Sequence, residues 1–336
     1  MRAFNPILKP LTLIIAMLFA CEQPLLAALP AGNAVTDGPS ILRNALPTEQ
    51  KDLRKMQHNL EATIREVSTL RGNRWDALSE AASSSEFVAT SRNIQILESI
   101  PETKKKEAEK ILHDLTKNLK NLNEKASAHD TDGYISMREK SLDQIGELEE
   151  LTIDSFPYTI PKEFEDLPRL LGRATVEITT TKGEITAVID GFNAPLTGGA
   201  FIDLVQKDFY KNLPFTRAED FYVLQTGDPE GPELGYIDPN TQQERHVPLE
   251  IRVPNEQETF YNETFEDIGI YKATPVLPFA ALGTLGWAHS DNALNDGSSQ
   301  FFFFLYEPEL TPAGLNLVDG RNAAFGYVVK GLKILK

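Results

Sequence analysis

Apolar residues recur every three or four positions from Leu46 to about Asp154. This spacing puts them on one face of a helix and leaves the opposite face to charged residues. The apolar positions are Leu53, Met56, Leu60, Ile64, Val67 and Leu70; Trp75, Leu78, Ala82, Phe87, Ile94 and Leu97; Ala108, Ile111, Leu112, Leu115, Leu119, Leu122 and Ala126; and Leu142, Ile145 and Leu148. Four amphipathic segments with short links predict an antiparallel helical bundle over residues 40–155.

The period changes from three or four to two in the second half of the chain. Residues 174–180 alternate between apolar and polar, Lys182 and Gly183 supply a turn signal, and residues 185–189 alternate again. This pattern predicts a β-hairpin. A helix-like segment over 199–213 follows, and strand-rich sequence punctuated by Gly and Pro continues to the end, which is typical of a β-barrel or sandwich with a few helices.

Residues 156–173 join the two halves. Pro157, Pro161 and Pro168 break helices and stiffen this segment. We interpret it as a Pro-containing linker at a domain boundary, so the sequence predicts an α+β multidomain protein.

The first 28 residues have the pattern of an export signal. Arg2 and Lys9 precede a short apolar run over 11–20, and small residues follow at Ala27 and Ala28. The apolar run is shorter than the roughly 20 residues that span a bilayer. Cys21 is the only cysteine, which excludes an intrachain disulfide; its surroundings approximate a lipoprotein processing site, so lipidation there is an alternative to removal with the signal.

The chain of 336 residues carries a net charge of −16, with a pI of about 4.8. An acidic surface argues against nucleic acid and against broad binding to anionic lipid, both of which favour clustered Lys and Arg. The five histidines lie far apart without the spacing of metal ligands, so we expect no metal and no cofactor. The charge-dense helix faces, such as residues 104–110, are either solvated surface or a protein-docking face.

A cation, an aromatic ring and an amide stand close together in the second half, at Arg217, Tyr222 and Gln225. Some 75 residues later a polar and then aromatic run spans 297–304. Together these residues predict an apolar slot with a few donors at its mouth, which suits binding and twisting of a prolyl peptide bond. Simple packing is the alternative for Tyr222, and strand alternation assigns half of Phe301 to Phe304 to the core.

The second half resembles the cyclophilin family from about residue 174 to 336. The stretches that carry the resemblance are Thr181-Lys-Gly-Glu-Ile185, Asn193-Ala-Pro-Leu-Thr197, Phe215-Thr-Arg217, Gln225-Thr-Gly-Asp228, Ala288-His289, Ser299-Gln-Phe-Phe302, Asp319-Gly-Arg-Asn322 and Phe325-Gly326. The resemblance implies a closed β-barrel with flanking helices and peptidyl-prolyl cis–trans isomerase activity. The acidic excursion between Asp228 and Leu285 is longer than the family usually has, and the chain stops where a cyclophilin would continue through a helix and a last strand. An unpaired barrel edge would result.

The resemblance also assigns roles to individual residues. It implies that Arg217 donates to the prolyl nitrogen as the amide twists and that Gln225 holds the peptide carbonyl. The residues expected at the substrate are Tyr222, Phe302 and Leu317 in the proline pocket, and Ala288, His289 and Asn322 beside it. Asn322 replaces a pocket histidine of the family, and Leu317 replaces the tryptophan that most members use to bind cyclosporin. Because Leu317 lacks an indole N–H donor, cyclosporin should bind weakly.

A helical bundle and an export signal ahead of such a domain resemble the multidomain cyclophilins of the thylakoid lumen, which are associated with photosystem II assembly. The resemblance implies a non-integral protein in the thylakoid lumen or periplasm whose partners are proline-containing segments, with photosystem II subunits among them. Three hypotheses stay open on the sequence. They are an isomerase that assists assembly, a weak or inactive module that binds proline loops, and a purely structural subunit acting through the bundle.

Overall fold

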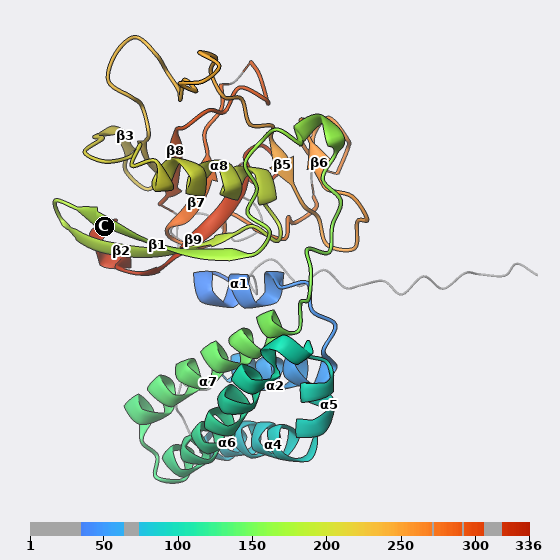
Figure 1. Cartoon of the computed structure of the whole chain (residues 1–336). Helices are drawn as coiled ribbons and strands as arrows, with labels where there is room; N and C mark the ends of the chain where they lie inside the picture. Colours follow the sequence, from blue (N-terminus) through green and yellow to red (C-terminus); the bar gives the residue numbers. More distant parts are fainter. Residues whose placement is uncertain (1–34, 64–73, 271, 291, 306–317) are drawn as a thin grey trace, which may run out of the picture.

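The structure is a computed structural model that describes residues 35–63, 74–270, 272–290, 292–305 and 318–336. Two separate hydrophobic cores organise these residues, one inside a set of helices and one around a sheet (Figure 1). We call the two parts the bundle and the sheet domain. The predicted signal over 1–28, Cys21 and Leu317 lie outside the described residues.

The bundle contains the helices that the apolar spacing predicts. They are α2 (Lys51–Ala62), α4 (Arg74–Ser91), α5 (Asn93–Glu98), α6 (Lys105–Ser127) and α7 (Thr131–Leu151), with a 3-10 turn, η1 (Glu102–Lys104), before α6. Leu53, Leu115 and Ile145 are fully buried between them. The described helices α4, α6 and α7 pack side by side, as expected for an antiparallel bundle.

Two of the residues that we expected on an apolar face, Phe87 and Ile94, are exposed at 70% and 63%. Phe87 lies within α4 five residues after Ala82, which turns it away from the buried face. The helical path is interrupted at Arg92, between α4 and α5, so the apolar face changes phase there and leaves Ile94 outside. Val88 and Ile96 take the buried positions instead.

The sheet domain is built on one curled, seven-stranded antiparallel sheet. Its strands are β1 (Arg173–Thr180), β2 (Gly183–Asp190), β3 (Phe215–Glu219), β4 (Val223–Thr226), β7 (Thr284–Trp287), β8 (Phe301–Phe304) and β9 (Ala324–Lys330), in the order β1-β2-β9-β7-β8-β4-β3. The predicted hairpin is confirmed, with Thr180 opposite Gly183. A closed barrel was expected, but among the described residues β1 and β3 are free edges, so the sheet is a half-barrel.

Shorter elements complete the sheet domain. A two-stranded sheet pairs β5 (Glu250–Ile251) with β6 (Phe260–Tyr261), and 3-10 turns form η2 (Lys162–Phe164) and η3 (Leu332–Ile334). The helix that we expected over 199–213 is α8 (Pro195–Gln206). It begins four residues earlier because Pro195 is well placed in the first turn of a helix.

Helix α1 (Gly38–Ala45) belongs to the core of the sheet domain, although it precedes the bundle in sequence. Its buried residues Ile41, Leu42 and Ala45 join that core, and the helix packs on β9. Figure 1 shows α1 between the sheet and the bundle. We expected residues from 40 onward to form part of the bundle. The structure instead places α1 in the core of the sheet domain.

The predicted linker is packed against the sheet domain rather than extended. Phe164 and Leu167 contact its core, and the ring of Phe164 lies 5.1 Å from that of Tyr261. The guanidinium carbon of Arg252 lies 3.4 Å from the ring centroid of Tyr158. Such contacts fix the path of the chain between the two cores.

Glu250 is a buried carboxylic acid at the first turn of α8. Its Oε1 accepts a hydrogen bond from the Thr197 N–H at 2.6 Å, and its Oε2 has no partner within the described structure. Burial raises the pKa of Glu250 from 4.5 to about 7. The folded state therefore favours the protonated form, because a charge without full hydrogen bonding is costly in an apolar site.

We expect the sheet domain to lose stability as pH rises. A folded pKa above the unfolded one gives stability that is complete below about pH 4.5 and is lost as pH rises through about 7. The free energy of unfolding should fall by about 2–3 kcal/mol over that range. Denaturant unfolding across the range should show this slope reduced in Glu250→Gln and unchanged in Glu230→Gln, at an exposed position. An equal slope in all three proteins would contradict the assignment.

None of the helices in the described part of the chain is both long and apolar enough to cross a membrane.

Candidate functional site

The candidate site is a row of residues on neighbouring strands. Arg217 of β3 stands opposite Gln225 of β4, Gln225 stands opposite Phe302 of β8, and Phe302 stands opposite Gly286 of β7. Directly opposed residues of antiparallel strands project from the same face of a sheet. The sheet register thus brings together a cation, an amide and an aromatic ring that lie up to 85 positions apart in the sequence.

Arg217 lies on the edge strand, where half of its side chain is exposed. Its Nε donates to Glu219 Oε1 at 2.7 Å, and its guanidinium carbon lies 5.7 Å from the ring centroid of Tyr222. The carboxylate and the ring restrict the guanidinium, which still has further N–H donors to offer a ligand.

Gln225 is half-buried and tied to Gln300. Its Nε2 donates to Gln300 Oε1 at 2.8 Å. Just after β4, Gly227 lies close to the residues that precede β8: its φ is +98°, and a Cβ there would lie 2.5 Å from the Ser299 carbonyl oxygen. Glycine at this position therefore allows β4 and the residues before β8 to run side by side.

Phe302 is 6% exposed and stacks on Phe279, with 5.7 Å between ring centroids. The ring sits where a side chain on Gly286 would lie, because a Cβ there would overlap both Phe302 and Phe279. Phe302 therefore lies at the base of the site, with little of its ring exposed.

An exposed aromatic ring lies beside Arg217. Tyr222 is 42% exposed, and its ring meets Phe304 edge-on at 6.1 Å. Phe215 (39% exposed) lies on β3 but faces the other side of the sheet, with its ring centroid 6.3 Å from that of Phe303. An exposed aromatic side chain beside a cation gives a partly apolar surface that suits a proline ring.

Ala288, His289 and Asn322 lie together at the end of β7. The Ala288 N–H donates to the Gln300 carbonyl at 3.0 Å, which connects this group to the row. The ring nitrogens of His289 lie 2.8 Å from the carbonyl oxygens of Ser290 and Arg321. Asn322 Nδ2 lies 3.5 Å from the Trp287 carbonyl. These side chains hold two loops together at the rim.

Three residues of the site were not singled out from the sequence, namely Gln300, Glu219 and Phe279. Gln300 lies within the Ser299-Gln-Phe-Phe302 stretch, directly before β8 and two residues before Phe302, so an alternation continued back from the strand could have indicated it. Glu219 stands two positions after Arg217 on the same strand, which is also a readable signal. No local pattern indicated Phe279.

The arrangement suits twisting of an amide bond rather than attack on it. A prolyl bond that leaves planarity loses resonance, against a barrier of about 18–20 kcal/mol. The pyramidal nitrogen regains a lone pair, to which a guanidinium can donate only as the bond twists. Within the described residues there is no group of three His, Cys, Asp or Glu side chains that could hold a metal ion.

Comparison with known proteins gives the family. Residues 175–336 match the model of the cyclophilin type peptidyl-prolyl cis-trans isomerases, and residues 37–153 match the PsbQ-like domain of CYP38-like peptidyl-prolyl cis-trans isomerases. The putative thylakoid lumen peptidyl-prolyl cis-trans isomerase of Synechocystis sp. is 46% identical over 94% of this chain and 83% of its own length. The chain belongs to the cyclophilin family. It pairs a cyclophilin-type isomerase domain with a PsbQ-like bundle, and the peptidyl-prolyl cis-trans isomerase CYP38, chloroplastic, of Arabidopsis thaliana is 35% identical over 91% of this chain and 71% of its own length.

Two solved cyclophilins match about half of this chain. A cyclophilin type isomerase of Cryptosporidium parvum, crystallised with the dipeptide Ala-Pro, is 22% identical, with a TM-score of 0.33 over 48% of this chain and 82% of that one. A cyclophilin from Hirschia baltica is 19% identical, with a TM-score of 0.32 over 49% of this chain and 69% of that one.

Proposed function

We propose that this cyclophilin catalyses cis–trans isomerisation of Xaa-Pro bonds and acts as a folding and assembly factor in the thylakoid lumen. The observation that carries the proposal is the cross-strand row of Arg217, Gln225 and Phe302. Arg217 donates to the prolyl nitrogen as it turns pyramidal, Gln225 holds a peptide carbonyl, and Phe302 with Tyr222 contacts the proline ring. Because Arg217 interacts with the nitrogen only in the twisted state, its contact lowers the barrier rather than merely adding affinity.

The remaining site residues would bind the peptide chain. Ala288, His289 and Asn322 form the rim beside Gln300, where backbone groups meet an extended peptide. Leu317 stays a proposed pocket residue on sequence alone.

The relatives support the proposed location and partners. A protein 46% identical to this chain is described as a thylakoid lumen isomerase, and the Arabidopsis relative as chloroplastic. The bundle matches a PsbQ-like domain, which supports photosystem II subunits as clients. The bundle lies on the β1–β2–β9 side of the sheet, away from β3, which leaves the described part of the site free for a client (Figure 1).

A proline-loop binding module with little turnover is the second candidate. Two observations favour it. Glu219 holds the Arg217 side chain, and Phe302 is only 6% exposed, so little of its ring is open to a proline ring.

Magnetisation-exchange NMR on a short peptide with one Xaa-Pro bond separates the two candidates. Uncatalysed cis–trans exchange takes tens to hundreds of seconds. We expect catalytic amounts of the full chain to make the exchange much faster than this. Saturable shift changes without accelerated exchange would establish the binding module instead. If the peptide shows neither accelerated exchange nor saturable shift changes, both candidates are overturned.

A further inference from the structure

The side-chain amide of Gln300 connects the site to the acidic excursion. Gln300 Nε2 donates to the Leu234 carbonyl oxygen at 2.8 Å and to Asp228 Oδ1 at 3.3 Å. Its Oε1 accepts from Gln225 Nε2 at 2.8 Å. Two hydrogen bonds in series thus lead from the backbone at Leu234 through Gln300 to Gln225.

The direction of this chain is fixed by its first member. A backbone carbonyl can only accept, so the nitrogen of Gln300 must face Leu234. The oxygen of Gln300 then faces Gln225, and only the side-chain nitrogen of Gln225 can donate a hydrogen bond to it. Turning either amide around would bring two oxygens or two NH₂ groups together, at the cost of these hydrogen bonds.

The Leu234 carbonyl is itself held by the segment of residues 229–247. The Tyr236 N–H donates to Ser298 Oγ at 2.8 Å. Antiparallel bridges pair Ile237 with Glu244 and Val247 with Gly297, so the segment is closed on itself and tied to the residues before β8. A Cβ at Gly235 would overlap the side chains of Ser298 and Glu244, which shows how closely the segment lies on its support.

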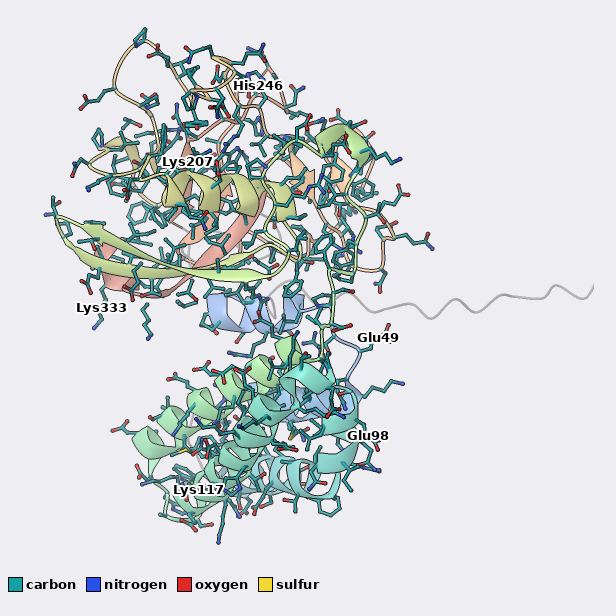
Figure 2. The ribbon with its side chains drawn as sticks, viewed as in Figure 1. Glu49, Glu98, Lys117, Lys207, His246 and Lys333 are labelled. Carbon is teal, nitrogen blue, oxygen red and sulfur yellow. The ribbon has the colours of Figure 1, made fainter. Side chains whose placement is uncertain are left out.

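A second anchor joins the same segment to α8. The Tyr236 ring is 7% exposed and has Lys207 Nζ 5.1 Å and the Arg245 guanidinium 4.7 Å from its centroid. Both cations bind Asp203 Oδ2, at 2.7 and 2.6 Å. Figure 2 shows Lys207 and His246 on the part of the cyclophilin domain that lies away from the bundle. Ion pairs and cation–π contacts on a buried ring hold a loop well.

We propose that the 229–247 segment sets the orientation of the Gln225 amide through Gln300, which makes Gln300 a positioning residue of the isomerase site. This inference rests on the proposed function, since it concerns the group that holds the substrate carbonyl. One N–H of Gln225 is used on Gln300, and the geometry of the amide then aims the other N–H away from Gln300, where a peptide carbonyl can accept it. The segment thus acts on catalysis without touching the substrate.

The test replaces the Gln300 amide by a group whose donor depends on pH. In Gln300→Glu the ionised carboxylate cannot donate to Leu234 and repels Asp228, whereas the protonated carboxyl restores one donor and one acceptor. We expect isomerase activity to fall on the order of tenfold near neutral pH, the scale of a misaligned contact, and to recover as the introduced carboxyl is protonated. Gln300→Met, which is similar in length but lacks both groups, should be impaired at every pH. Gln206→Glu makes the same charge change at an exposed position of α8 and should follow the wild type.

The side-chain amide signals of Gln225 give a second reading that needs no turnover. In the Gln300→Glu protein, assigned by comparison with Gln225→Met, the Gln225 NH₂ resonances should shift with pH more strongly than they do in wild type, where Asp228 supplies the carboxylate of the network. If wild type fails to isomerise the peptide but this stronger shift is seen, the proposed function fails and the orientation by Gln300 stands. Gln225 signals that shift with pH no more than those of wild type, or a Gln300→Glu activity profile parallel to wild type, would overturn the inference.

Discussion

Replacing Arg217 by alanine should reduce kcat/KM for isomerisation of a short Xaa-Pro peptide by about 10²–10³-fold, the usual scale for removing one donor aimed at the charge that develops in a transition state. Arg217 projects from the same face as Gln225 and is half-exposed, so the substitution leaves no cavity and should not unfold the domain. Initial rates at equal protein concentration measure the effect. Arg92→Ala, at an exposed position in the bundle, is the matched control.

Two further variants show whether the guanidinium itself is responsible. Arg217→Lys keeps the charge but loses the planar set of donors, so it should recover only part of the rate. Glu219→Gln weakens the 2.7 Å contact that restrains Arg217 and should raise the rate or leave it unchanged. Full activity in Arg217→Ala would exclude this residue from catalysis.

Removing the apolar side chains of α1 should destabilise the cyclophilin domain, although α1 stands before the bundle in sequence. Ile41 and Leu42 are each 4% exposed within the core around the sheet. Each truncation to alanine should cost about 2–5 kcal/mol, because it loses buried apolar contacts and leaves a cavity. For the same reason, a fragment that starts at Arg173 should fold poorly unless residues 38–45 are supplied, which matters for any assay on the isolated domain.

The two tryptophans of the chain make this prediction measurable. Trp75 lies in the bundle and Trp287 in the cyclophilin core, so in a Trp75→Phe background the fluorescence reports the cyclophilin domain alone. We expect the double variant of Ile41 and Leu42 to lower the Trp287 transition. Leu115→Ala, fully buried in the bundle, should affect that transition far less. An unchanged Trp287 transition in the double variant would show that α1 is dispensable for the domain.

Local periodicity predicted much of the fold because most elements carry their own signal. The stripes at Leu53 and Leu115 mark faces that are buried in the bundle, and alternation on both sides of Gly183 marks the hairpin of β1 and β2. Helix α1 was missed because an eight-residue segment carries too few apolar positions to show which of two cores it joins. Phe87 was misplaced because it stands five residues after Ala82, about 140° around α4 from the buried face. Ile94 was misplaced because the interruption at Arg92 changes the phase of the apolar face.

The sequence indicated which residues form the candidate site better than it indicated their burial and orientation. Arg217, Gln225 and Phe302 are brought into one row by strand register, as the motif resemblance implied. The burial of Phe302 depends on the absence of a side chain at Gly286, and the orientation of Gln225 depends on a carbonyl at Leu234. Contacts between residues so far apart in sequence leave no local pattern, so they became visible only with the strands assembled.

The most direct test of the central claim measures affinity and bound-state exchange together, by NMR line shapes on one Xaa-Pro peptide titrated with wild type and with Arg217→Ala. If Arg217 acts on the twisted bond, the dissociation constant should change by no more than about threefold while the cis–trans exchange rate of the bound peptide falls by about 100-fold or more. An exchange rate that is unchanged by the substitution, or one that falls only in proportion to affinity, would contradict the account and leave Arg217 as a residue that only holds the peptide.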